Sequence, residues 1–293
     1  MNAVYSFWSK PYLANGKKVH GEVSAKMFAL CWILSVHYAK RYFDKVKLVT
    51  DTEGYKALVE LDLPFDSVSL ELDDIPDSVL PEMWAYGKLI AYEVQKEPFV
   101  HIDYDAFLFK KPCKQFYEAD IIVQHKEYFH LENHFYYSSI RKEVKNWDFE
   151  SKYYYNKAPY AYNCGTFGGN DLEFIKKYVG EAKKLALYPN KDQLNKLGSI
   201  ERRLFPIAFE QHILGSICYE EKETNQIFET ARDDKRIDEL GYFHLMGGKK
   251  NPLFLKQLEM KALKECSKEY MAWVHKTMMK NPENYLSLNN YEI

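Results

Sequence analysis

Residues 99–109, FVHIDYDAFLF, form the stretch that decides how the rest of the chain is interpreted. The apolar residues predict a strand, and Asp103 and Asp105 interrupt them. Side chains at positions i and i+2 of a strand share a face, so both carboxylates are expected to point out at its carboxyl end. Two carboxylates this close repel each other unless a cation lies between them, and their oxygens suit Mg²⁺ or Mn²⁺. The stretch therefore predicts a divalent-cation site.

Strands and helices alternate along the chain on both sides of this stretch. Further strands are expected at 3–8, 46–50, 67–72 and 120–124. Helices are expected at 22–43, 53–61, 83–95, 171–187, 210–218 and 253–279. Such alternation predicts an α/β fold, with a mostly parallel central sheet, helices on both faces, and ligands at the carboxyl ends of the strands.

The composition excludes several classes of protein. The 40 basic and 42 acidic residues give a net charge of -2, so no positive field attracts nucleic acid. The most apolar stretch, residues 27–36, is far shorter than the ~20 residues that a membrane helix needs. The five cysteines are scattered without a CxxC pair, which favours reduced thiols over a disulfide framework or a zinc site. With no signal-peptide pattern, we expect a soluble, cytoplasmic protein without a transmembrane segment.

Four further motifs flank the Asp103-x-Asp105 pair in the sequence. They are Gly87-Lys88-Leu89, Asn163-Cys164-Gly165-Thr166, Glu210-Gln211-His212 and residues 244–250, HLMGGKK. The set resembles the motifs of GT-A nucleotide-sugar glycosyltransferases, in the order found in retaining family 8, the glycogenin and galactosyltransferase type. Glu210 and His212 replace aspartates of family 8, and together with Phe167-Gly168-Gly169 they resemble retaining family 6, the blood-group transferase type.

The resemblance implies a GT-A fold and a metal-dependent glycosyltransferase. The donor would be a nucleotide-diphosphate sugar, with a UDP-sugar favoured, and the acceptor an unidentified carbohydrate or other hydroxyl compound, with retention at the sugar. No internal repeat, low-complexity segment or linker divides the chain, so we expect one domain over 1–293. Its parts would be a nucleotide-binding half at 1–124, an acceptor and catalytic half at 125–252 and a helical tail at 253–293.

Two groups of binding residues follow from the resemblance. The implied metal ligands are Asp103, Asp105 and His244, and the imidazole nitrogen favours Mn²⁺ over Mg²⁺. The residues implied in donor binding are Ser6, Trp8, Lys88, Asp103, Tyr104, Asn163, Gly165, Gly247 and Lys250.

Glu210 and Gln211 are the candidate catalytic residues. An oxocarbenium-like transition state needs a negative or dipolar group beneath the anomeric carbon. Glu210 could be a nucleophile, a stabilising carboxylate or the base for an acceptor hydroxyl. Alternatively, it could stabilise the N-terminus of a helix at 210–218 through the helix dipole.

Other interpretations remain for single residues and for the whole chain. Trp8 could be a core residue, His244 a buried histidine and Lys250 a solvated lysine. A noncatalytic carbohydrate-binding protein on the same fold is one alternative function. A sugar nucleotidyltransferase is another, but it should carry a glycine-rich loop after the first strand, and residues 6–14 contain no glycine.

A polar, tyrosine-rich segment at 125–162 interrupts the alternation of strands and helices. Tyrosine and tryptophan rings offer apolar faces to sugars and polar edges to hydroxyl groups. We therefore interpret the segment as a lid that binds the acceptor and closes over the donor. The alternative is an extra aromatic packing layer without ligand contacts.

Overall fold

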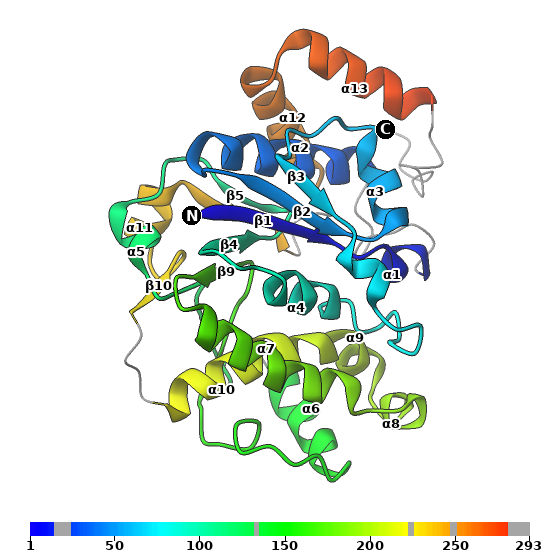
Figure 1. Ribbon diagram of the computed structural model, residues 1–293, viewed down its shortest axis with the longest axis vertical. Helices are drawn as coiled ribbons and strands as arrows, with labels where there is room; N and C mark the ends of the chain where they lie inside the picture. Colours follow the sequence, from blue (N-terminus) through cyan, green and yellow to red (C-terminus); the bar gives the residue numbers. More distant parts are fainter. Residues whose placement is uncertain (15–24, 132–134, 222–225, 247–250, 281–293) are drawn as a thin grey trace.

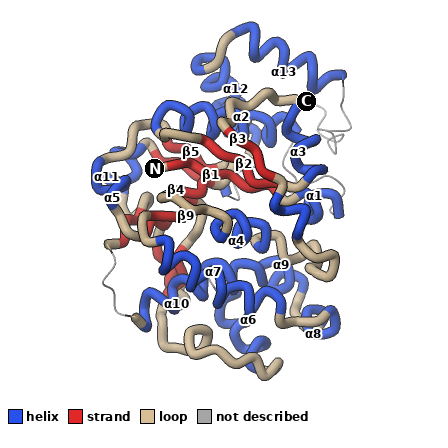
Figure 2. Tube along the Cα trace, viewed as in Figure 1, coloured by secondary structure: helices blue, strands red, loops and turns tan. Residues whose placement is uncertain are grey.

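A seven-stranded sheet lies at the centre of the protein (Figure 2). The computed structural model describes residues 1–14, 25–131, 135–221, 226–246 and 251–280 of the chain. In spatial order the strands are β3 (Ser67–Ser69), β2 (Val46–Thr50), β1 (Asn2–Phe7), β4 (Phe99–Ile102), β9 (Thr166–Gly169), β6 (Ile121–Val123) and β10 (Ile227–Glu229). β9 runs antiparallel to both of its neighbours, β4 and β6, and the other strand pairs of this sheet are parallel.

Helices cover both faces of this sheet (Figure 1). One side carries α2 (Ala25–Tyr42) and α12 (Pro252–Glu265), and the other carries α4 (Tyr86–Glu93), α7 (Leu172–Leu187) and α10 (Ile213–Glu220). The other helices are α1 (Ser9–Ala14), α3 (Thr52–Val59), η1 (Glu71–Asp74), α5 (Lys114–Glu118), α6 (Phe135–Lys145), α8 (Lys191–Asn195), α9 (Ser199–Ile207), η3 (Ala208–His212), α11 (Asp234–Leu240) and α13 (Lys268–Lys280). Two strand pairs lie outside the main sheet, β5 (Ala106–Leu108) with β11 (Tyr242–His244) and β7 (Lys126–Tyr128) with β8 (Tyr160–Tyr162). The predicted α/β class, with a mostly parallel central sheet and helices on both faces, is confirmed.

Successive strand residues are buried on opposite faces of the sheet. Val4 and Phe99 belong to the core that includes α4 and α7. Ala3, Tyr5 and Val100 belong to the core beneath α2. Because both faces are covered, these strands are mostly apolar and do not alternate regularly between polar and apolar residues.

The stretch at 99–109 forms two strands, and the expectation of a single strand is wrong. After β4 the chain turns through Asp103 and Asp105, and β5 leaves the main sheet to pair antiparallel with β11. The Ala106 N–H donates to the Asp103 carbonyl oxygen at 2.8 Å and closes the turn. The two aspartates therefore lie in a turn at the edge of the sheet, and His244 is the pairing partner of Ala106.

The tyrosine-rich segment at 125–162 contains α6 and the β7–β8 pair. Its side chains Trp147, Tyr153 and Tyr154 are 5%, 3% and 1% exposed. Rings buried to this degree have almost no surface left for a ligand. For these three rings the burial supports the aromatic packing layer. Tyr128 of the same segment is 38% exposed, so the acceptor lid stays a prediction.

The expected helix at 253–279 is divided into α12 and α13. Cys266 has an extended backbone, with φ -106° and ψ 159°, and ends α12. The Ser267 hydroxyl oxygen then accepts the Tyr270 N–H at 3.0 Å at the start of α13. This side-chain contact satisfies a backbone donor that has no partner within the new helix.

All five cysteines are free, and Cys31, Cys164 and Cys218 are buried. Within the described ranges, no helix is both long enough and apolar enough to cross a membrane.

We predict that Gly169→Ala destabilises the protein by about 2 to 4 kcal/mol, because both backbone angle and space exclude a side chain. Gly169 has φ +138°, and an added Cβ would lie 1.9 Å from the Asp120 carbonyl oxygen. The matched control is Gly180→Ala in α7, where an added Cβ meets nothing within 4 Å. The control should raise the free energy of unfolding by roughly 0.5–1 kcal/mol. Urea unfolding of both variants measures the difference, and equal stabilities would contradict the prediction.

Candidate active site

The candidate site lies where β4, β6 and β9 meet at one edge of the sheet. β4 and β6 end at this edge, and β9 begins there because it is antiparallel to both. The Asp103 N–H donates to the Gly165 carbonyl oxygen at 2.9 Å. The Gln124 N–H donates to the Asn163 carbonyl oxygen at 2.9 Å. The carboxyl ends of the strands are where open α/β sheets bind ligands.

Asp103, Asp105 and His244 form a cluster that could hold a metal ion. Each offers one ligand atom, and the three atoms lie within 4.8 Å of one another. His244 Nε2 is 3.4 Å from Asp105 Oδ1, which is buried. Carboxylate oxygens with one imidazole nitrogen suit a divalent first-row cation. The predicted grouping of these three residues is confirmed.

Gln124 orients the imidazole of His244. The Gln124 side-chain oxygen lies 2.7 Å from His244 Nδ1 and also accepts the Tyr242 hydroxyl at 2.7 Å. A carbonyl oxygen only accepts, so Nδ1 carries the proton and Nε2 keeps a lone pair on the side of Asp105. Gly165 gives this pair its space, since a Cβ there would lie 2.1 Å from the Gln124 oxygen.

Sequence reasoning missed Gln124. A signal was present, because Gln124 directly follows the apolar strand β6 and thus stands at the same edge as Asp103. Its partner His244 lies 120 residues further along the chain, so the contact itself has no local signature.

Lys88 connects the cation cluster to the candidate catalytic residue. Its Nζ lies 2.7 Å from Asp103 Oδ1 and 2.9 Å from Glu210 Oε1. Burial alone would lower the pKa of Lys88, but the charges of Asp103 and Glu210 outweigh it and raise that pKa. Burial raises the pKa of Glu210, and the Lys88 charge opposes this shift. The positive charge of Lys88 therefore balances the charges of the two carboxyl groups in a largely buried environment.

Glu210 lies in the middle of a helical run, not at the start of a helix as one interpretation assumed. α9, the π-helical segment η3 and α10 follow one another without a break. The helix-dipole explanation of Glu210 is therefore wrong. The Tyr178 hydroxyl donates to the Glu210 carbonyl oxygen at 2.7 Å. Isolated π turns of this kind are frequent at functional sites.

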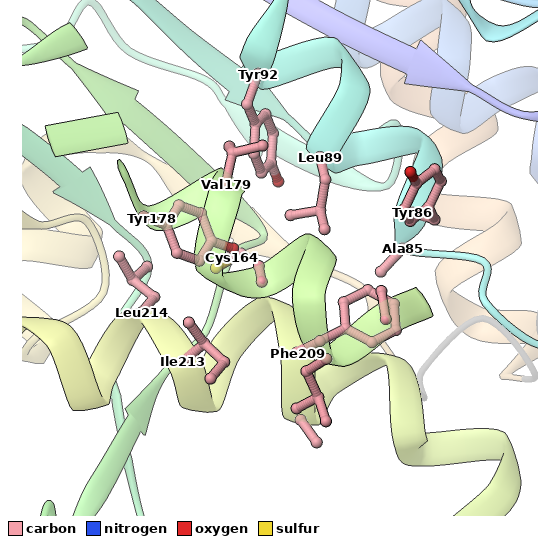
Figure 3. Close-up of a cluster of buried hydrophobic side chains, with 14 of the residues drawn as sticks. Ala85, Tyr86, Leu89, Tyr92, Cys164, Tyr178, Val179, Phe209, Ile213 and Leu214 are labelled. Carbon is pink, nitrogen blue, oxygen red and sulfur yellow. The ribbon is translucent and has the colours of Figure 1, made fainter. Parts of the chain in front are cut away.

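An apolar cluster fixes the two elements that carry Lys88 and Glu210. Leu89 and Tyr92 of α4 lie near Tyr178 of α7 and Phe209 of η3 (Figure 3). The Tyr92 hydroxyl also donates to Glu210 Oε1 at 3.2 Å. The ammonium and the carboxylate are thus positioned by packing around them as well as by their own attraction.

Three predicted donor-binding residues make contacts within the protein. Ser6 Oγ lies 2.8 Å from His101 Nε2. Trp8 is 8% exposed and belongs to the core, which supports its structural interpretation over stacking on a base. Tyr104 stacks on Trp32, with ring centroids 5.3 Å apart and 18° between the planes. The Tyr104 ring therefore packs against α2.

Asn163 and Gln211 belong to a buried polar network that sequence reasoning did not detect. Asn163 Nδ2 donates to Glu127 Oε1 at 2.7 Å. The Tyr137 hydroxyl lies 2.8 Å from both Glu127 Oε2 and Gln211 Oε1. Glu127, on β7, therefore joins a predicted donor-binding residue to a predicted catalytic residue. The predicted residues Gly247 and Lys250 lie outside the described residues.

Together, fold and site define an α/β protein with a three-residue cation cluster at the carboxyl edge of its sheet. Residues 1–290 match a family described as "Family of unknown function (DUF6734)", and the chain belongs to this family. A search of curated proteins gave no match. Among solved structures, the chain is similar to the galactosyltransferase LgtC in complex with donor and acceptor sugar analogues. The identity is 12% and the TM-score 0.42, over 93% of this chain and 100% of the other.

We predict that His212→Gln makes the protein less sensitive to acid. Burial lowers the pKa of His212 from 6.5 to about 4, so the folded state keeps the ring neutral while the unfolded chain takes up a proton. Stability is therefore lost as pH falls from about 6.5 towards about 4, by roughly 1.4 kcal/mol per pH unit at most. Glutamine does not titrate and can still donate to the Tyr154 carbonyl oxygen, which His212 Nε2 contacts at 3.0 Å.

The measurement is urea unfolding of wild type and variant at a series of pH values. The exposed His275, changed to Gln, serves as the matched control. An identical loss of stability with falling pH in wild type and His212→Gln would refute the conclusion that His212 causes the acid sensitivity.

Proposed function

We propose that the protein is a metal-dependent glycosyltransferase of the GT-A type that moves a sugar from a nucleotide-diphosphate sugar to a hydroxyl acceptor. One observation carries this proposal: Asp103 belongs to the cation cluster and also contacts Lys88, which in turn contacts Glu210. The ammonium group of Lys88 thus lies between the candidate cation site and the buried carboxyl group of Glu210. Breaking the bond between a sugar and a diphosphate needs charge stabilisation on both sides of that bond.

The residues present fit a divalent cation held by Asp103, Asp105 and His244. A cation bound there supplies Lewis-acid stabilisation of the charge that develops on the departing diphosphate. Gln124 holds His244 in the tautomer whose Nε2 can ligate, through the contact at 2.7 Å. The nitrogen ligand favours Mn²⁺ over Mg²⁺.

Glu210 acts on the sugar side of the bond. Its Oε1 accepts hydrogen bonds from Lys88 and Tyr92. Its Oε2 is buried and has no hydrogen-bond partner among the residues that the structure describes. That oxygen would stabilise an oxocarbenium-like carbon through its charge, because the fully buried side chain leaves no surface for direct attack.

The donor lies along the same edge of the sheet. Asn163 and Gly165 border the sugar, and Lys88 approaches the sugar or the diphosphate. The motif resemblance assigns Gly247 and Lys250 to the diphosphate, since backbone amides and an ammonium group suit phosphate. The preference for uridine rests on the motif resemblance, and the acceptor is a carbohydrate or another hydroxyl compound.

We predict that Asp105→Asn lowers Mn²⁺-dependent nucleotide release from the donor sugar by at least about 100-fold, because several kcal/mol of stabilisation is lost. The amide keeps the shape of the side chain, so the melting temperature without metal should stay close to that of wild type. The matched control is Asp192→Asn, an exposed position on α8. Full metal-dependent release by the Asp105 variant would disprove the metal role.

We predict that UDP with Mn²⁺ raises the melting temperature. A ligand that binds only the folded state at 100 times its Kd contributes about 2.7 kcal/mol of stability. GDP and CDP are measured in parallel, each with Mn²⁺ and with a chelator. A shift with GDP or CDP but none with UDP would refute the uridine preference while leaving the class of donor intact.

A further inference from the structure

Glu127 lies at the centre of a buried network outside the cation cluster. Glu127, Tyr137, Asn163 and Gln211 are 6%, 4%, 6% and 8% exposed. Glu127 comes from β7, Tyr137 from α6 and Gln211 from η3, so three separate elements meet here. Polar groups buried in this way need every donor to face an acceptor.

The orientation of Asn163 is fixed independently. The Gly165 N–H donates to Asn163 Oδ1 at 2.9 Å. The Asn163 amide nitrogen is therefore the end that donates to Glu127 Oε1 at 2.7 Å. Glu127 Oε1 must be an acceptor in this contact.

The orientation of the Gln211 amide then follows from counting protons. The Tyr137 hydroxyl lies 2.8 Å from Glu127 Oε2 and 2.8 Å from the Gln211 side-chain amide. A hydroxyl has one proton, and a carboxylate has none to offer, so Tyr137 donates to Glu127. The Tyr136 hydroxyl also hydrogen-bonds with Glu127 and Tyr137. With its own proton directed to Glu127, the Tyr137 oxygen can only accept, so the Gln211 amide nitrogen lies on that side. The hydrogen-bond network thus fixes which end of the Gln211 amide is nitrogen.

We propose that Glu127 is a positioning residue that, through Tyr137, turns the Gln211 carbonyl oxygen away from the network and towards the donor sugar. This inference rests on the proposed function. The end of the Gln211 amide that does not face Tyr137 makes no hydrogen bond with any described residue. A carbonyl oxygen there presents the negative end of a dipole to a carbon that becomes positive, whereas an NH₂ group would present the positive end.

We call the chain of hydrogen bonds from Glu127 through Tyr137 to Gln211 the relay. The substitution Glu127→Gln tests the relay because it should reverse the direction of these hydrogen bonds. The fixed Asn163 nitrogen needs an acceptor, so the new glutamine must turn its oxygen to Asn163 and its NH₂ group to Tyr137. Tyr137 then accepts from residue 127 and donates to Gln211, whose oxygen turns inward. We expect kcat for sugar transfer to fall by about tenfold or more while the donor KM changes by less than about twofold.

A double-mutant cycle separates this relay from a merely structural effect. If Glu127 acts through Tyr137, then Glu127→Gln lowers kcat no further in a Tyr137→Phe background. The matched control is the partly buried pair in which the Tyr38 hydroxyl donates to Glu265 Oε1 at 2.6 Å, between α2 and α12. Tyr38→Phe and Glu265→Gln should leave kcat unchanged. An unchanged kcat in Glu127→Gln, a parallel loss of donor affinity, or additive effects in the cycle would each overturn the inference.

A neutron structure of the deuterium-exchanged protein gives a readout that needs no activity. We expect a deuterated amide nitrogen on the Tyr137 side of Gln211 in wild type and an oxygen there in Glu127→Gln. An oxygen on that side in wild type would refute the relay even if the enzyme turns over. Absence of metal-dependent turnover in wild type would instead count against the proposed function, so the two failures are distinguishable.

Discussion

The attraction between one ammonium group and two carboxyl groups is the constraint around which the site is arranged. Removing Lys88, Asp103 and Glu210 from water is costly, and each is tolerated because the others are present. α7 packs against both α4 and η3 and so brings the charges together, since Lys88 lies on α4 and Glu210 on η3. The helices on this face of the sheet therefore contribute to the hydrophobic core and also position the charged groups.

Much of the fold could be predicted from the sequence because parallel strands and helices have distinct patterns. The apolar runs at β1, β2 and β6 and the spacing in α2 and α7 are local signals, and the structure places elements there. The break after β4 is different. It depends on β5 pairing with β11, a segment far away in the sequence, so the apolar run at 99–109 gave no indication of it.

In the candidate site, too, residues with a local sequence signal could be predicted and residues that depend on distant partners could not. Asp103, Asp105 and His244 could be grouped from motifs, because residue type and spacing carry chemical meaning in them. Gln124 had only the signal of its position directly after β6, and Glu127 had none, because a glutamate within a strand is ordinary. Their importance comes only from the partners that the tertiary structure supplies, and hydrogen-bond networks of this kind leave no periodic trace.

The long sequence separation of these contacts has a consequence for folding. Lys88 and Glu210 are 122 residues apart, and Gln124 and His244 are 120 residues apart. Contacts between such distant segments form late, because closing a long loop costs chain entropy before any contact compensates for it. The β1–β2 region can pair while the chain is still emerging from the ribosome, but the cation cluster has to wait for β11. Chains interrupted before residue 242 would thus contain most of a sheet but lack His244, one of the three candidate metal ligands.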